Sequence, residues 1–91
     1  MSGLTRDVMI VNKRGLHARA SAKFVAMAAE MSGTVFTVTK GAHSANGTSI
    51  LGLMMLGAAK GDTVTLSASG VDAADRLAEM VALVEAGFDE D

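Results

Sequence analysis

The sequence predicts one α+β domain, an open-faced β-sandwich in which three helices cover one face of a four-stranded antiparallel sheet. The 91 residues are enough for one two-layer core but not for two separate cores. Segments with strand-like and helix-like patterns follow one another in the order β-α-β-β-α-β-α. The clearest strand has one apolar and one polar face, as in an antiparallel sheet with one face in water. The sequence contains no repeat or linker, so residues 1–91 are expected to form a single domain.

The first strand and the first helix have clear signals. A short apolar and partly β-branched run predicts a strand over residues 6–12, and turn-forming residues follow it up to Gly15. From Ala18 to Met31 the pattern has the period of a helix. The apolar residues that recur at i, i+3, i+4 and i+7 are Phe24, Met27, Ala28 and Met31. Gly33 is a natural end for this helix.

Three further strands are predicted. Residues 34–39 are rich in β-branched and aromatic side chains, which are typical of a strand. A turn at residues 40–42 leads to a short, weakly determined partner strand over residues 43–46. The strand over residues 63–69 alternates between a polar face and an apolar face. The apolar face consists of Val64, Leu66 and Ala68.

A last helix is predicted to begin after Asp72, a good N-cap, and to end at Gly87. Its expected apolar stripe consists of Ala74, Leu77, Ala78, Val81 and Val84. The tail from Phe88 to Asp91 is acidic and is expected to fray.

The second helix, predicted from Ser49 to Ala59, carries an unusual surface. Residues 50–59 have no polar side chain, and they spread over more than one face of a helix. A two-layer domain buries one face of a surface helix, so the remaining residues form an exposed apolar patch, which is typical of a partner site. Methionine suits such a site because its flexible side chain adapts to different surfaces. The alternative is that this helix is more enclosed than a two-layer domain implies.

Composition excludes several classes of function. The net charge is -2, the basic residues are scattered, and the chain has three Phe with no Trp or Tyr, so we expect no nucleic-acid binding. The absence of Cys excludes a disulfide and a thiolate metal site. The N-terminus has no secretory signal, and no apolar run approaches the roughly 20 residues of a membrane span. We therefore expect a cytoplasmic protein without membrane insertion.

His17 is the strongest candidate for chemistry because it stands at the start of the first predicted helix. A helix N-terminus attracts anions through its free N–H groups and its dipole, and Arg19 adds a guanidinium that matches phosphate oxygens. Neutral imidazole is nucleophilic, so a ring nitrogen of His17 can accept a phosphoryl group. The alternative for a lone histidine here is a cap or a surface residue. No carboxylate lies nearby in sequence to orient the ring, no second ligand stands at metal spacing, and His43 is expected to be a surface residue.

Two segments carry a family resemblance. The first is Arg14-Gly15-Leu16-His17-Ala18-Arg19, and the second covers residues 46–62, from Asn46-Gly47-Thr48-Ser49 through the apolar helix to Lys60-Gly61-Asp62. Both resemble HPr, the histidine-containing phosphocarrier family of the bacterial phosphoenolpyruvate:sugar phosphotransferase system. The tail over residues 86–91 is most similar to the nitrogen-related branch, often called NPr. The sheet order of the family, 1-4-2-3, is therefore expected here.

The resemblance implies a role for each matching residue. His17 would accept phosphate through Nδ1 from the phosphohistidine of Enzyme I and pass it to an EIIA-type protein, while Arg19 would steady the phosphoryl group. Ser49 matches the serine that HPr kinase/phosphorylase modifies in many relatives. The partner-binding surface would consist of Leu16, Ala20, Ile50, Leu51, Met54 and Met55. The resemblance implies no cofactor and no metal, and a monomer is expected.

Two positions depart from the family pattern. Ala20 stands where relatives usually have proline, and alanine, a good helix former that restores an N–H group, predicts an intact site with a slightly looser entry. Arg14 stands where relatives often have a small polar residue, and it adds a positive charge three residues before His17.

The sequence leaves two functions open. One is a phosphocarrier, which is a protein substrate in a phosphotransfer chain and not a free-standing enzyme. The other is a regulatory interaction module of nitrogen or carbon signalling on the same fold. It would use the apolar second helix without turning over phosphate at histidine and without sugar transport. Ser49 also has an alternative, since serine is a common N-cap. The presence of His17 with Arg19 favours the first function.

Overall fold

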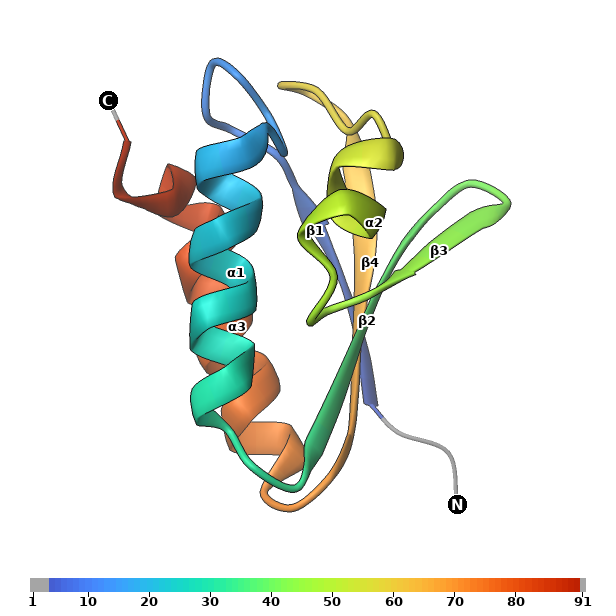
Figure 1. Cartoon of the computed structure of the whole chain (residues 1–91), viewed down its shortest axis with the longest axis vertical. Coiled ribbons are helices and arrows are strands. Elements are labelled where there is room, and N and C mark those ends of the chain that lie inside the picture. Colours follow the sequence, from blue (N-terminus) through green and yellow to red (C-terminus); the bar gives the residue numbers. More distant parts are fainter. Residues whose placement is uncertain (1–3, 91) are drawn as a thin grey trace.

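The computed structural model describes residues 4–90 and has the predicted order of elements (Figure 1). The strands are β1 (Leu4–Met9), β2 (Thr34–Lys40), β3 (His43–Asn46) and β4 (Thr63–Gly70). The helices are α1 (Ala18–Glu30), α2 (Ile50–Met55) and α3 (Ala73–Glu85), and the 3-10 helix η1 (Gly87–Asp89) follows them. The strands pair antiparallel in the order β1-β4-β2-β3, which confirms the expected fold class and sheet order. Between residues 4 and 90, no helix has the length and apolar character needed to cross a membrane.

β4 lies between β1 and β2 and pairs with both. One face of this strand meets the core, and the other face is more exposed to solvent. Its side chains Val64, Leu66 and Ala68 are buried, as the alternation predicted. On the opposite face, the Thr65 hydroxyl donates a hydrogen bond of 2.7 Å to the Asp7 carboxylate of β1. The period of two along this strand therefore determines which side of the sheet receives the helices.

α1 and α3 lie side by side across one face of the sheet, and α2 lies near the N-terminal end of α1 (Figure 1). Phe24 of α1 packs edge to face against Phe36 of β2, with ring centroids 6.4 Å apart. Edge-to-face packing is a favourable geometry for two aromatic rings because of their quadrupoles. This pair joins the helical layer to the sheet in a chain with only three aromatic residues.

Two element boundaries differ from the prediction. β1 begins and ends earlier than residues 6–12, although Ile10 still exchanges backbone hydrogen bonds of 2.8 Å with Gly61 and Asp62. α2 ends at Met55 instead of Ala59. Its last amides, those of Leu56 and Gly57, bond to carbonyls three residues earlier, which tightens the final turn, and the chain then leaves the helix.

The predicted apolar stripe of α3 is wrong at two positions. Leu77, Val81 and Val84 are buried as expected, but Met80 is buried where Ala74 and Ala78 are exposed. The longer Met80 side chain reaches the core and the alanines face solvent. Asp72 precedes the helix as predicted, but it has a left-handed backbone (φ 50°) and makes no side-chain cap bond.

The C-terminal tail is ordered, which corrects the expectation that it frays. Phe88 is 0% exposed and lies in the hydrophobic core, and it has the left-handed backbone (φ 58°) within η1. The Lys23 ammonium of α1 donates a hydrogen bond of 2.6 Å to the Phe88 carbonyl. The buried ring and this bond tie residues 87–90 to the start of α1. Asp91 lies outside the described residues.

Candidate functional site

His17 is the N-cap residue of α1, with an extended backbone (φ -76°, ψ -176°) and no capping bond from its side chain. Its carbonyl accepts the first bond of the helix, from the Ser21 amide at 2.9 Å. The Ser21 hydroxyl donates to the Leu16 carbonyl at 3.2 Å. The imidazole therefore makes no bond to its own helix, and it lies at the end that carries the unpaired amides and the positive end of the dipole.

The loop before His17 is held against the segment that follows α2. The Leu16 amide donates to the Ala58 carbonyl at 2.9 Å. Gly15 has a left-handed backbone (φ 62°), and a Cβ atom there would lie 2.2 Å from the Ala58 oxygen. Only glycine combines this backbone with so close an approach. The connection fixes the position of His17 relative to α2.

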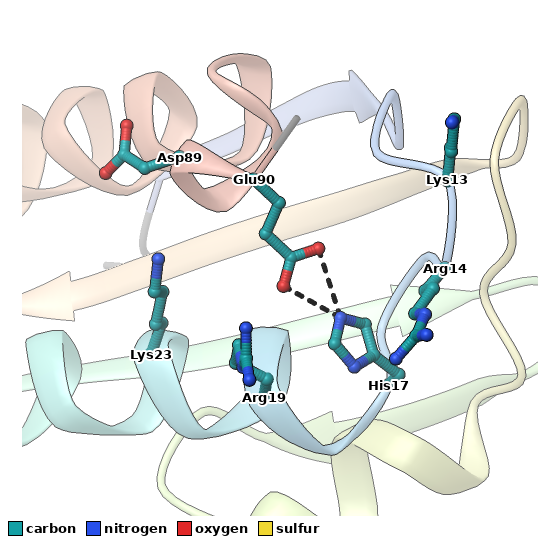
Figure 2. Close-up of a pocket in the computed structure, with 7 residues that line it drawn as sticks. All are labelled: Lys13, Arg14, His17, Arg19, Lys23, Asp89 and Glu90. Atoms are coloured by element: carbon teal, nitrogen blue, oxygen red, sulfur yellow. Dashed lines mark hydrogen bonds and ion pairs between the residues drawn. The ribbon is translucent and has the colours of Figure 1, made fainter.

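An open pocket of about 630 Å³ surrounds His17. Its walls come from the loop after β1, the first turns of α1 and the C-terminal tail (Figure 2). The lining residues are Lys13, Arg14, His17, Arg19, Lys23, Asp89 and Glu90. In Figure 2 the side chains of Arg14 and Arg19 lie on either side of the His17 ring. Four cationic side chains around one imidazole make the pocket suitable for a phosphate group.

A carboxylate absent from the local sequence contacts His17. The Nε2 atom of His17 lies 2.8 Å from Oε2 and 3.1 Å from Oε1 of Glu90, which is 73 residues away in the chain. The second ring nitrogen lies on the side of the ring away from Glu90 (Figure 2). Glu90 is too distant in the sequence for the residues around His17 to predict the contact. No local pattern signals a contact that the ordered tail creates.

Asn12 holds the same carboxylate from the other side. Its Nδ2 group donates to Oε1 of Glu90 at 3.0 Å and to the Gly15 carbonyl at 2.8 Å. Burial of the Glu90 carboxyl raises its pKa, but hydrogen bonds from Asn12 and His17 outweigh this effect, so the net pKa lies below the ordinary value. Glu90 is therefore a carboxylate at neutral pH, and it can only accept hydrogen bonds.

Arg19 projects from the second helical position of α1 and is exposed. Within residues 4–90, its guanidinium makes no hydrogen bond or ion pair with another side chain. The group is thus available to an anion in the pocket. The predicted proximity of His17 and Arg19 is present in the structure.

Ser49 is the N-cap residue of α2, and its hydroxyl accepts a hydrogen bond of 2.9 Å from the Gly52 amide. The hydroxyl therefore has the structural role that the alternative reading assigned to it. A role in regulation does not conflict with capping, since the side chain is partly accessible to solvent.

Part of the expected partner surface is exposed and part of it is not. The exposed residues form what we call the α2 patch, with exposed fractions of 41%, 67%, 40% and 78%; they are Ile50, Leu51, Met54 and Met55. Leu16 (6%) and Ala20 (0%) are buried instead, which corrects their assignment to the surface. Leu16 follows the turn that approaches Ala58, and Ala20 is on the inner face of α1.

Comparison with known proteins identifies the family. The family model described as "PTS HPr component phosphorylation site" matches residues 4–86. The chain belongs to the HPr family. It is 44% identical to the phosphocarrier protein NPr of Shewanella violacea, over 99% of this chain and 98% of that protein. It is also 44% identical to the phosphocarrier protein HPr of Neisseria meningitidis, over 96% and 97% of the two chains.

Solved HPr structures have the same fold. The crystal structure of HPr-C-His from Thermoanaerobacter tengcongensis superposes with a TM-score of 0.89 at 39% identity, covering 97% of this chain and 98% of that one. The HPr of Bacillus anthracis gives a TM-score of 0.86 at 30% identity, covering 92% and 99%. The match to the HPr family model includes His17, Arg19 and Ser49, whereas Glu90 lies beyond its last matched residue.

Proposed function

We propose that this HPr-family protein accepts a phosphoryl group on Nδ1 of His17 from the phosphohistidine of Enzyme I and passes it to an EIIA-type protein. The observation that carries the proposal is the bond between Nε2 of His17 and Glu90, made beside two guanidinium groups at a helix N-terminus. Because Nε2 is engaged, Nδ1 is the ring nitrogen available to phosphorus. The cytoplasm, where the proposal locates both partners, is the expected compartment.

The transfer needs no group beyond those of the two proteins. The lone pair on Nδ1 attacks phosphorus, a new N–P bond forms, and the N–P bond of the donor breaks with its electron pair returning to the donor imidazole. Arg19 and the free amides at the start of α1 would stabilise the phosphoryl oxygens during this exchange. Transfer to the acceptor is the same step in reverse, with His17 as the leaving group.

The α2 patch supports the protein-binding part of the proposal. Its four exposed apolar side chains lie near the loop that carries His17, because Leu16 bonds to Ala58, three residues after α2. The apolar patch and the cationic pocket around His17 together suit a partner with an apolar surface and acidic edges. Arg14 is one of the cationic residues of that pocket.

The experiment incubates the protein with phosphoenolpyruvate and purified Enzyme I and measures phosphate that is labile in acid and stable in alkali. Wild type is expected to take up one phosphoryl group and His17→Ala none. His43→Ala is a matched control, since His43 is exposed on β3 and away from the pocket, and it is expected to behave as wild type. Label that persists in His17→Ala contradicts the assignment, and a wild type that stays unlabelled favours the regulatory module.

We further propose that phosphorylation of Ser49 lowers the affinity for Enzyme I. The added negative charge would lie beside Leu51 and Met54 and would repel an acidic partner, while the helix N-terminus would stabilise the phosphate itself. Asp and Asn cap helices about as well as Ser, so Ser49→Asp adds charge and Ser49→Asn is the neutral control. Phosphoryl uptake is expected to slow about tenfold in Ser49→Asp only, because complementary charge sets the rate of association. Equal rates in the two variants contradict an inhibitory role.

A further inference from the structure

We propose that Glu90 is a positioning residue that holds the Nε2–H group of His17, keeps Nδ1 free of a proton and balances the positive charge that develops on the ring during phosphoryl transfer. This inference rests on the proposed function and adds a residue to it. It concerns a part of the chain outside residues 4–86, which the HPr family model matches.

The carboxylate is placed by several contacts and not by one flexible pair. Phe88, two residues before Glu90, is fully buried, and its carbonyl accepts a hydrogen bond from Lys23. The Asn12 side chain, 3% exposed, donates to Glu90 from the opposite direction. Both carboxylate oxygens then lie within 3.1 Å of His17 Nε2. Isolated surface ion pairs contribute little because their side chains must be ordered, but here the backbone and the acceptor are already held.

The contact selects one form of the neutral imidazole. A neutral ring has one N–H group, and its other nitrogen has a lone pair. Since Glu90 is ionised and can only accept, the nitrogen that faces it must be the donor. The proton therefore stays on Nε2, and the lone pair stays on Nδ1, on the side of the ring away from Glu90 (Figure 2). The nucleophile is ready without a prior proton transfer.

The same contact acts on the transition state. While the N–P bond to Nδ1 forms and the donor N–P bond breaks, the His17 ring keeps its Nε2 proton and becomes cationic. A carboxylate 2.8 Å from that nitrogen stabilises this charge without taking the proton. The aspartate of a serine–histidine–aspartate triad acts on its histidine in this way. Glu90 would thus favour uptake, because uptake creates the positive charge on the ring and release removes it.

The test compares three variants of the full chain in phosphoryl uptake from phosphorylated Enzyme I. Glu90→Ala removes the acceptor, and Glu90→Gln keeps an acceptor oxygen but loses the charge. Glu85→Gln is the matched control, because it removes one negative charge from the exposed last residue of α3, which does not line the pocket. Within residues 4–90 the Glu85 side chain makes no hydrogen bond to His17.

We expect uptake to slow about tenfold in Glu90→Ala, less in Glu90→Gln, and less than twofold in Glu85→Gln. Uptake by Glu90→Ala that is as fast as uptake by Glu85→Gln overturns the inference. Faster uptake in Glu90→Ala also overturns it, since the tail would then obstruct the site.

A second measurement does not depend on Enzyme I. Nitrogen-15 NMR of the His17 ring, at a pH where the ring is neutral, reports which nitrogen carries the proton. Wild type and Glu85→Gln are expected to show the Nε2–H form, and Glu90→Ala an increased share of the Nδ1–H form. An unchanged share in Glu90→Ala contradicts the positioning role. A wild type that takes up no phosphate refutes the proposed function instead, and the NMR result then still decides whether Glu90 sets the tautomer.

Discussion

Gly15→Ala is expected to lower the free energy of unfolding by about 2 to 4 kcal/mol. Two physical effects contribute to this loss of stability. A left-handed backbone (φ 62°) disfavours any residue with a Cβ atom, and the new Cβ would lie 2.2 Å from the Ala58 carbonyl oxygen. Atoms cannot stay at that separation, and only a movement of the backbone at residue 15 or at Ala58 can separate them. The loop can relieve the clash only by giving up the bond between Leu16 and Ala58. Urea denaturation measures the loss.

Gly41→Ala is the control for this prediction. Gly41 has nearly the same backbone (φ 60°), but a Cβ atom there has no atom within 4 Å, among the residues that the structure describes. Its cost should be the backbone term alone, about 1 kcal/mol. Equal destabilisation of Gly15→Ala and Gly41→Ala would show that residue 15 lies farther from the Ala58 oxygen than the structure places it.

Gly15→Ala is also expected to slow the phosphoryl transfer. His17 follows Gly15 by two residues, so moving the loop displaces the imidazole from Glu90 and from the start of α1. A displacement of 1 Å at a reacting group can slow a reaction about 100-fold. Phosphoryl uptake at a temperature where the variant remains folded should fall by about that factor. Gly41→Ala should retain the wild-type rate.

Phe88→Ala is expected to destabilise the protein by about 3 to 5 kcal/mol, the usual cost of removing a buried aromatic ring. Phe88 is fully buried in η1, and no other aromatic ring anchors the tail. Without this ring, residues 87–90 lose their hold on the core and the Glu90 carboxylate leaves His17. The variant should therefore lose two things together, stability in denaturation and the Nε2–H signature of His17 in NMR.

Met80→Ala separates these two losses. Met80 is equally buried but lies on α3, away from the pocket. Its replacement should cost about 2 to 5 kcal/mol through the lost side chain and the cavity, and leave the His17 spectrum unchanged. An unaltered His17 spectrum in Phe88→Ala would mean that the tail stays in place without its anchor.

Local patterns predicted most of this fold because most elements have a local cause. The alternation along β4 and the helical period of α1 each identified the correct inner face. The pattern failed where the inner face depends on the rest of the molecule. In α3 an alanine and a methionine both fit an apolar stripe, and only packing on the sheet brings Met80 inward and leaves Ala78 exposed.

The functional site also combines features that local sequence predicts with features that depend on the rest of the molecule. His17 and Arg19 were identified from their spacing and from the helix start that follows. Leu16 and Ala20 were expected at the surface, but the turn at Gly15 directs Leu16 into the core. Glu90 could not be foreseen, because its contact with His17 joins residues 73 positions apart and depends on the buried Phe88. Sequence proximity carries no information about such a contact.

The hydrogen bond between Leu16 and Ala58 has a consequence for recognition. It ties the loop that carries His17 to the segment after α2, so it sets the distance between the reacting ring and the α2 patch. Under the proposed function, a protein that seats on α2 reaches His17 only if its own histidine stands at the matching distance from its apolar surface. The donor and the acceptor would then need the same distance between histidine and apolar surface, but not the same fold. A protein whose histidine stands at a different distance from its apolar surface would bind to α2 without exchanging phosphate.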